Sequence, residues 1–356
     1  MIWRRRADRL GVTLGGLQSQ YPGNFLLPAR SAENDSLFVA NHCLDVDGLG
    51  RRRWPLLCAR AALMQALAMN RAGDLRQWAG RAVLALLRKT RHAWRVNFTI
   101  HTSIGRRRFA VPIVFGCGVA DGATRETWLN DILRRCFERR AGAFVDVGAN
   151  LGQTLLKVRA LDPDRPYYGF EPHPFCCHYL RELVARNALR ACAIVPVALA
   201  DRVTVTPLLS TGATDTWATI VDGFRPSARY SRADPVPVFD GDSVLRQLAA
   251  PPVACIKIDA EGAELDVLRG LQQTIARDRP YILCEILPVH NPATPQGALR
   301  LSRQDQLFEF ITSHGYRLYR VSTNRPTPIT AIGIHDDVSM SNYVLVPDAE
   351  PDWPVE

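Results

Sequence analysis

After Gly142 the chain alternates between short apolar runs and amphipathic segments for about 200 residues, and this alternation constrains the fold most strongly. We predict seven strands, at 143–147, 167–170, 193–198, 253–258, 280–287, 316–322 and 342–347. Helices are expected near 152–161, 174–188, 262–276 and 303–314. Apolar strands separated by amphipathic helices are typical of a largely parallel, helix-covered sheet, an α/β fold. No convincing helix joins the last two runs, which favours an antiparallel terminal hairpin.

The chain upstream of this region has a different pattern. Residues 1–74 contain arginine clusters and scattered glycines without periodicity, so we expect a basic, irregular or partly disordered extension. Residues 75–142 contain a predicted amphipathic helix, a β-hairpin (96–100 with 107–115) and a second helix near 125–140. The apolar face of the first helix is expected to comprise Leu75, Trp78, Ala79, Val83, Leu86 and Leu87. We expect 75–142 to pack on a core domain at 143–356; a partner surface or membrane adsorption is the alternative for that helix.

Charge is divided unevenly along the 356 residues. Residues 1–110 carry 19 basic and 6 acidic residues, a net of +13, whereas 111–356 carry 25 basic and 29 acidic residues, a net of −4. A nucleic-acid footprint in the larger part is therefore disfavoured. The basic N-terminal part could instead make peripheral contact with an anionic membrane. Homo-oligomer formation is left open by the sequence.

Cellular location is predicted from two absences in the sequence. No apolar run approaches the roughly 18 residues that span a bilayer, and the N-terminus lacks the apolar stretch of a secretory signal. We therefore expect a cytoplasmic protein. The nine cysteines are odd in number and include no Cys-x-x-Cys, so we predict reduced thiols, without a disulfide framework or a zinc site.

The segment FVDVGANLGQT at 144–154 runs from an apolar strand through a glycine-containing turn into a helix. Such a turn lets a ligand approach the backbone and the free N–H groups of the helix. The spacing is G-x-N-x-G, and Asp146 stands two residues before Gly148. A carboxylate there would repel a pyrophosphate and attract an ammonium group. The turn therefore favours S-adenosylmethionine over NAD as the ligand.

Two further strand ends carry acidic residues. The strand YYGF ends in Glu171-Pro172, 23 residues after Gly148, where a carboxylate can accept both hydroxyls of a ribose. The strand ACIKI runs into Asp259 and Glu261, and alternation places Lys257 on the same face as Asp259. Because an unpaired buried ammonium is costly, Lys257 should have a partner, either Asp259 or Glu285 at the end of the next strand.

Taken together, these segments resemble the FkbM-type S-adenosylmethionine-dependent methyltransferases over about 144–290. The matching pieces are FVDVGANLGQT, GFEPHP, the helix from Leu180 to Asn187, VPVALADR, IKIDAEGAELDVLRG and RPYILCEILP. The resemblance implies a Rossmann-like class I methyltransferase fold with a seven-stranded sheet. It also implies O-methylation of a hydroxyl on a sugar, glycan or secondary metabolite, with S-adenosyl-L-methionine as the cofactor.

The resemblance implies site residues as well. Cofactor contacts carried over to this sequence are Asp146, Gly148, Ala149, Asn150 and Gly152 around the methionine moiety, Glu171 and Pro172 at the ribose, and Ala198, Leu199 and Asp201 near the adenine. Lys257, Asp259 and Glu261 fall beside the methyl group that is transferred. The first amphipathic helix and most of Ser210–Asp234 lie outside the resemblance, so the acceptor is not identified.

Methyl transfer to an alcohol is an in-line displacement that benefits from a general base. We predict Asp259 or Glu261 as the base, Glu285 as a second candidate, and Lys257 as the residue that orients one of them. His173 and His290 are alternative bases in loops after strands. A Mg²⁺ ion held by Asp259, Glu261 and Glu285 is a further alternative, although no metal site is predicted.

Two other classes of function stay open at this point. An NAD-dependent oxidoreductase would share the βαβ layout and the acidic residue after the second strand, but it would need the missing third glycine position. A non-catalytic S-adenosylmethionine-binding scaffold would keep the cofactor residues without turnover.

Overall fold

The computed structural model describes residues 72–90, 92–119, 126–212, 214–321, 326–350 and 352–353, with side chains of the first helix described from Gly80 onward. The chain divides into two units, Met1–Gln65 and Ala66–Glu356, and every described residue belongs to the second. The predicted N-terminal extension lies outside the described residues, apart from the first turn of a helix at 72–74.

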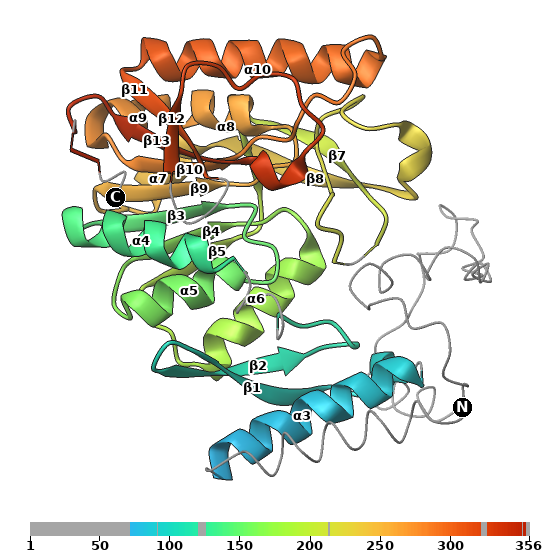
Figure 1. The fold of residues 1–356 in the computed structure, drawn as a ribbon. Helices are drawn as coiled ribbons and strands as arrows, with labels where there is room; N and C mark the ends of the chain where they lie inside the picture. Colours follow the sequence, from blue (N-terminus) through green and yellow to red (C-terminus); the bar gives the residue numbers. More distant parts are fainter. Residues whose placement is uncertain are drawn as a thin grey trace, which may run out of the picture. The chain divides into compact units, whose positions relative to one another are not determined.

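One eight-stranded sheet forms the centre of the described unit (Figure 1). The strands are β3 (Ala143–Val147), β4 (Tyr167–Phe170), β5 (Cys192–Val195), β9 (Val253–Ile258), β10 (Tyr281–Glu285), β11 (Tyr316–Val321), β12 (Pro326–Ile329) and β13 (Asn342–Pro347). Their spatial order is β12-β11-β13-β10-β9-β3-β4-β5. The pairs linking β10, β9, β3, β4 and β5 are all parallel, and β13 lies antiparallel between β10 and β11. The seven predicted strands and the antiparallel end are confirmed, and β12 adds an edge strand that we did not predict.

Helices cover both faces of this sheet (Figure 1). One face carries α4 (Thr127–Arg139), α5 (Gln153–Leu161) and α6 (Pro174–Arg186); the other carries α7 (Gly241–Gln247), α8 (Glu264–Gly270), α9 (Gln272–Asp278) and α10 (Pro295–Ser313). Alternation along β3 explains the two cores, because Phe144 packs in the first and Val145 in the second. The single helix expected at 262–276 is wrong in one respect: the chain leaves the helical conformation at Leu271, between α8 and α9.

The segment before the core domain folds as α3 (Ala72–Lys89), a 3₁₀ turn η2 (Ala93–Arg95) and the hairpin β1 (Phe98–Ile104) with β2 (Arg107–Ile113). Helix α3 packs on β1 through Gly80 and Leu84. The apolar face predicted for this helix needs correction, because Val83 and Leu86 are exposed whereas Leu84 is buried. The side chains of Leu75, Trp78 and Ala79, which belong to the same predicted face, lie outside the described residues.

A second, three-stranded sheet lies beside the first and was not predicted. It contains β6 (Ala198–Ala200), β8 (Arg232–Asp240) and β7 (Thr204–Ser210) in that order. The connection between β7 and β8 turns back on itself, since Leu209 pairs with Thr219, and it ends in a 3₁₀ turn η4 (Ser227–Arg229). A further 3₁₀ turn, η5 (Val338–Met340), precedes β13.

The expectations about cysteines and about membrane-spanning segments can be compared with the described residues. No disulfide joins any two of the seven cysteines among them. Within the described ranges, every helix is too short or too polar to cross a bilayer.

Candidate functional site

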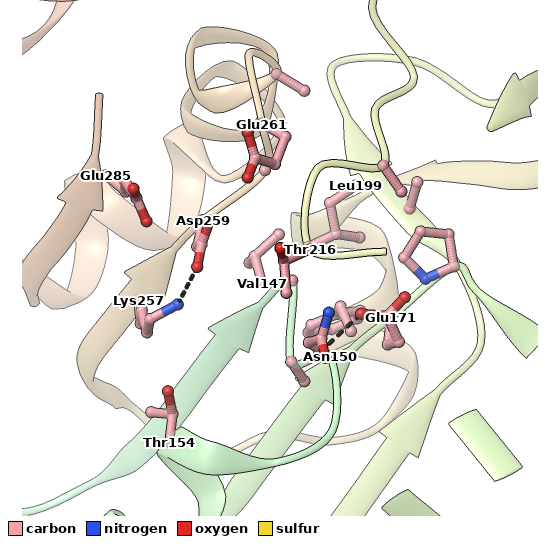
Figure 2. Close-up of a pocket in the computed structure, with 18 of the residues that line it drawn as sticks. Val147, Asn150, Thr154, Glu171, Leu199, Thr216, Lys257, Asp259, Glu261 and Glu285 are labelled. Atoms are coloured by element: carbon pink, nitrogen blue, oxygen red, sulfur yellow. Dashed lines mark hydrogen bonds and ion pairs between the residues drawn. The ribbon is translucent and has the colours of Figure 1, made fainter. Parts of the chain in front are cut away.

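A cavity of about 410 Å³ opens at the carboxyl ends of the central parallel strands (Figure 2). Its walls come from the ends of β3, β4, β9 and β10, from the start of α5 and from the β7–β8 connection. The chain runs outward from β3 through β4 and β5, then returns to β9 on the other side of β3. At such a reversal the connections diverge and leave a crevice, which is where open α/β sheets bind ligands.

The turn after β3 forms one wall of the cavity. Gly148 has a φ of +79°, and a Cβ at this position would lie 1.9 Å from the carbonyl oxygen of Asp259. The Asp259 amide in turn donates a hydrogen bond to the Val147 carbonyl at 3.0 Å. Only glycine permits so close an approach with this backbone conformation. The turn after β3 and the turn after β9 are therefore locked side by side, with Gly148, Ala149 and Asn150 lining the cavity.

Glu171 lies just beyond the end of β4 and faces this turn. One oxygen of its carboxylate accepts a hydrogen bond from the backbone amide of Asn150 at 2.8 Å, and the other accepts from the amide of His173 at 2.8 Å. Burial raises the pKa of Glu171 to about 7, although both hydrogen bonds favour the charged form. Each carboxylate oxygen has two lone pairs, so both can still accept a hydroxyl from a ligand.

Lys257 and Asp259 occupy the opposite part of the cavity. Their Nζ and Oδ2 atoms lie 3.0 Å apart (Figure 2). Burial alone would lower the pKa of Lys257, but the charges of Asp259 and Asp146 outweigh it and raise that pKa above its usual value. Lys257 therefore keeps its charge at neutral pH and fixes one oxygen of Asp259.

Glu285 and Glu261 flank Asp259 (Figure 2). The charge of Asp259, together with burial, raises the pKa of Glu285 to about 9. Burial and the same charge raise the pKa of Glu261 to about 7, against the effect of its ion pair with Arg225. At neutral pH, Glu285 thus carries a proton that it can donate to an oxygen, while Glu261 titrates. The cluster offers a proton acceptor, a donor and a fixed cation within one cavity.

The described carboxylates of the cavity are not arranged as a set of metal ligands. Within the part of the chain that the structure describes, no three His, Cys, Asp or Glu side chains are grouped to hold a metal. The carboxylates of Asp259 and Glu261 are paired with Lys257 and Arg225 instead. These cations supply the positive charge that a bound Mg²⁺ would otherwise bring.

Most of the predicted site residues lie around this one cavity. All four predicted catalytic residues line it. Seven of the ten predicted cofactor contacts line it as well: Gly148, Ala149, Asn150, Glu171, Pro172, Ala198 and Leu199. The predicted residues that line the cavity are up to 137 positions apart in the sequence, from Gly148 to Glu285.

Three predicted cofactor contacts do not line the cavity and are corrected here. Asp146 is fully buried on the face of β3 that α5 covers, and its carboxylate accepts a hydrogen bond from the Tyr167 hydroxyl at 2.5 Å. Gly152 begins α5 in a left-handed conformation, and a Cβ there would press on Leu180 and Leu183 of α6, so its role is in packing. Asp201 lies on the surface in an ion pair with Arg202.

The two histidines considered as alternative bases also lie elsewhere. His173 is largely buried and caps the start of α6 by accepting a hydrogen bond from the Phe175 amide through Nδ1. His290 is exposed in the loop after β10. Neither belongs to the cavity lining.

Sequence reasoning missed two groups of lining residues. The first is the β7–β8 connection, which contributes Asp215, Thr216, Trp217, Ala218 and Ile220. The alternation in TVTPLL and PVPVF was a usable signal for these strands, although it did not predict that their connection would reach the cavity. The second comprises Glu126, Trp128 and Leu129 at the start of α4, together with Gln153 and Thr154 of α5.

Comparison with known proteins adds a family to this geometry. Residues 146–318 match the family model of the methyltransferase FkbM domain. No curated protein matches the sequence.

The matching solved structures have low sequence identity to this chain and low TM-scores. The methyltransferase FkbM from Methylobacillus flagellatus is 14% identical, with 58% of this chain and 43% of that chain covered and a TM-score of 0.36. This chain thus spans less than half of that protein. The precorrin-6y C5,15-methyltransferase from Geobacter metallireducens is 12% identical, with 64% and 90% covered and a TM-score of 0.34. A putative O-methyltransferase from Klebsiella pneumoniae is 12% identical, with 62% and 79% covered and a TM-score of 0.35.

Proposed function

We propose, on the match of residues 146–318 to the methyltransferase FkbM domain, that the chain transfers a methyl group from S-adenosylmethionine to a hydroxyl of a sugar, glycan or secondary metabolite. One observation carries the proposal. A single cavity has a backbone-anchored carboxylate, Glu171, at one end and the Lys257–Asp259 pair beside a protonated Glu285 at the other.

The cavity fits the cofactor in size and in chemistry. Pockets for small molecules and cofactors measure about 300–1,000 Å³, and this one measures about 410 Å³. Glu171 would accept the ribose hydroxyls, and the turn at Gly148–Asn150 would lie along the rest of the nucleoside. S-adenosylmethionine supplies a methyl group already activated by a positively charged sulfur.

Asp259 is the general base in this proposal. An alcohol is a poor nucleophile until its proton leaves, and a positioned base typically contributes 10²–10⁴-fold to the rate. Lys257 holds Oδ2 of Asp259, which leaves Oδ1 to accept the proton of the acceptor hydroxyl. The lock between the turns after β3 and β9 fixes Asp259 relative to the cofactor wall. Glu261 is the second candidate, because it lies in the same cavity with a pKa of about 7.

The β7–β8 connection supports a hydroxyl-rich acceptor. Trp217 lines the cavity, and the guanidinium of Arg229 lies 3.7 Å from its ring centroid. An aromatic ring can pack against the apolar face of a sugar, while carboxyl groups exchange hydrogen bonds with its hydroxyls. Arg225 joins these parts, because it donates to the Trp217 carbonyl at 3.1 Å and pairs with Glu261. The wall at Trp217 and the acidic cluster are thus connected.

The proposal is tested with S-adenosylmethionine labelled in its methyl group. The purified chain is incubated with separate fractions of sugars, glycans and small metabolites, beside an Asp259→Asn variant and an Asp305→Asn control on the exposed side of α10. We expect label in at least one hydroxyl-bearing product, lost with Asp259→Asn and kept with Asp305→Asn. Binding of NAD in place of S-adenosylhomocysteine would instead favour an oxidoreductase. Binding of S-adenosylhomocysteine without a labelled product in any fraction would favour a scaffold.

A further inference from the structure

The amino-acid end of S-adenosylmethionine carries an ammonium group, which a nearby carboxylate would stabilise. Asp146 cannot supply this carboxylate by direct contact, because it is fully buried beneath α5 and bonded to Tyr167. The cavity must therefore provide the negative charge from another element. At the acceptor end, Asp259 is paired with Lys257, and Glu261 is paired with Arg225. The charge of Asp259 raises the pKa of Glu285, so that Glu285 is protonated at neutral pH.

Glu126 is a further carboxylate on the cavity wall. It directly precedes α4, outside the matched range 146–318, and lines the cavity together with Trp128, Gln153 and Thr154. About half of its side chain, 53%, is exposed. Its φ of 53° is a conformation that residues other than glycine rarely adopt. Among the described residues, only the Lys157 ammonium donates a hydrogen bond to its carboxylate.

Lys157 holds Glu126 from behind the cavity wall. Its side chain is completely buried in α5, and its Nζ lies 2.9 Å from Oε2 of Glu126. Burial lowers the pKa of Lys157, and the charge of Glu126 opposes this effect. A buried ammonium needs such a partner, so the pair fixes one carboxylate oxygen and leaves Oε1 for a ligand.

The position of Glu126 matches the expected end of the cofactor. Glu171 defines the ribose side, and Figure 2 places Thr154 across the cavity from it. A nucleoside whose ribose contacts Glu171 and whose sulfur lies along Gly148–Asn150 extends its amino-acid end toward the first turn of α5. Gln153 and Thr154 form that turn, and Glu126 lies with them in the cavity lining.

We propose that Glu126, positioned by its ion pair with Lys157, binds the α-ammonium group of the cofactor and selects nucleosides that carry the intact amino-acid end. This inference rests on the proposed function. It assigns to a residue outside the matched domain the role that the sequence had suggested for Asp146.

Isothermal titration calorimetry with two ligands tests the inference. S-adenosylhomocysteine has the amino-acid end, whereas 5′-methylthioadenosine has the same nucleoside without it. We expect Glu126→Gln to weaken S-adenosylhomocysteine binding about tenfold, and to change 5′-methylthioadenosine binding less than twofold. Glu138→Gln, at an exposed position of α4, is the matched control and should change neither.

A second variant separates a loss of ligand binding from a loss of folding. Glu126→Gln leaves the Lys157 charge buried without its counter-ion, so Glu126→Gln with Lys157→Met removes both charges and should show the same ligand selectivity. Unchanged binding of S-adenosylhomocysteine, or equal weakening of both ligands, would overturn the inference while leaving the proposed function intact. If the unaltered chain bound neither ligand, the proposed function would fail and this inference with it.

Discussion

The two ends of the cavity differ in the groups that form them, which are backbone amides at one end and charged side chains at the other. At the Glu171 end, backbone amides hold the carboxylate in place, and the wall is the glycine turn after β3. At the Asp259 end, the wall consists of charged side chains, and each one alters the protonation of its neighbours. The first end therefore has fixed geometry and suits recognition of a constant ligand. The second can accept and donate protons, as a reaction at a hydroxyl requires.

The largest expected effect comes from replacing the proposed base, Asp259, by its uncharged isostere. Asp259→Asn should lower turnover by about 10²–10³-fold, because a proton acceptor is lost. S-adenosylhomocysteine affinity should change less than threefold, since the Glu171 end is untouched. Comparing kcat with titration calorimetry on the same preparation separates the two ends. An equal loss of binding and turnover would mean that the ends are not independent.

The reverse experiment removes the recognition end. Glu171→Ala deletes the proposed acceptor for the ribose hydroxyls and should weaken S-adenosylhomocysteine binding about 30-fold, or about 2 kcal/mol. Glu182→Ala, in a surface ion pair of α6 with Arg186, is the control and should leave the affinity unchanged. Affinity that survives Glu171→Ala would remove the ribose assignment.

A pH profile sharpens the contrast between the ends. Because the pKa of Glu261 is about 7, its carboxylate is mostly protonated at pH 6 and mostly ionised at pH 8. Its pair with Arg225, which also holds the Trp217 carbonyl, should therefore form as the pH rises. We expect kcat/KM to increase several-fold between pH 6 and 8, and Glu261→Gln to flatten the profile. A profile with the same inflection in the variant would contradict this role.

The smallest effect is on stability. The pKa of Glu285 is about 9 in the folded chain against an ordinary value of 4.5, so its contribution to stability is complete below about pH 4.5 and is lost as the pH rises through about 9. Glu285→Gln should remove this loss. Urea denaturation should show the variant gaining about 1–2 kcal/mol relative to the unaltered chain between pH 7 and 8. A constant difference across that range would show that Glu285 is not protonated in the folded state.

Much of the fold could be predicted because the strands of the central sheet are apolar runs bounded by turns. Strand ends then located Glu171, Asp259 and Glu285 at one edge of the sheet, since parallel strands share their carboxyl edge. The edge strand β12 was missed because PTPI contains two prolines and reads as a loop.

The site residues that were wrongly predicted or missed depend on burial and on contacts between segments far apart in the sequence. Alternation assigns Asp146 to a face of β3, but it does not reveal that α5 covers that face and that Tyr167 supplies a hydrogen bond. Gly152 looked like a ligand contact because glycine serves close packing and ligand approach alike. Glu126 and Trp217 reach the cavity only through the tertiary placement of α4 and the β7–β8 connection, for which local pattern offers no signal.

A crystal structure of the chain with S-adenosylhomocysteine tests the central claim most directly. We predict both ribose hydroxyls within hydrogen-bond distance of the Glu171 carboxylate, with the sulfur facing Asp259 across the turn at Gly148. A ligand bound outside this cavity, or one whose ribose lies away from Glu171, would contradict it.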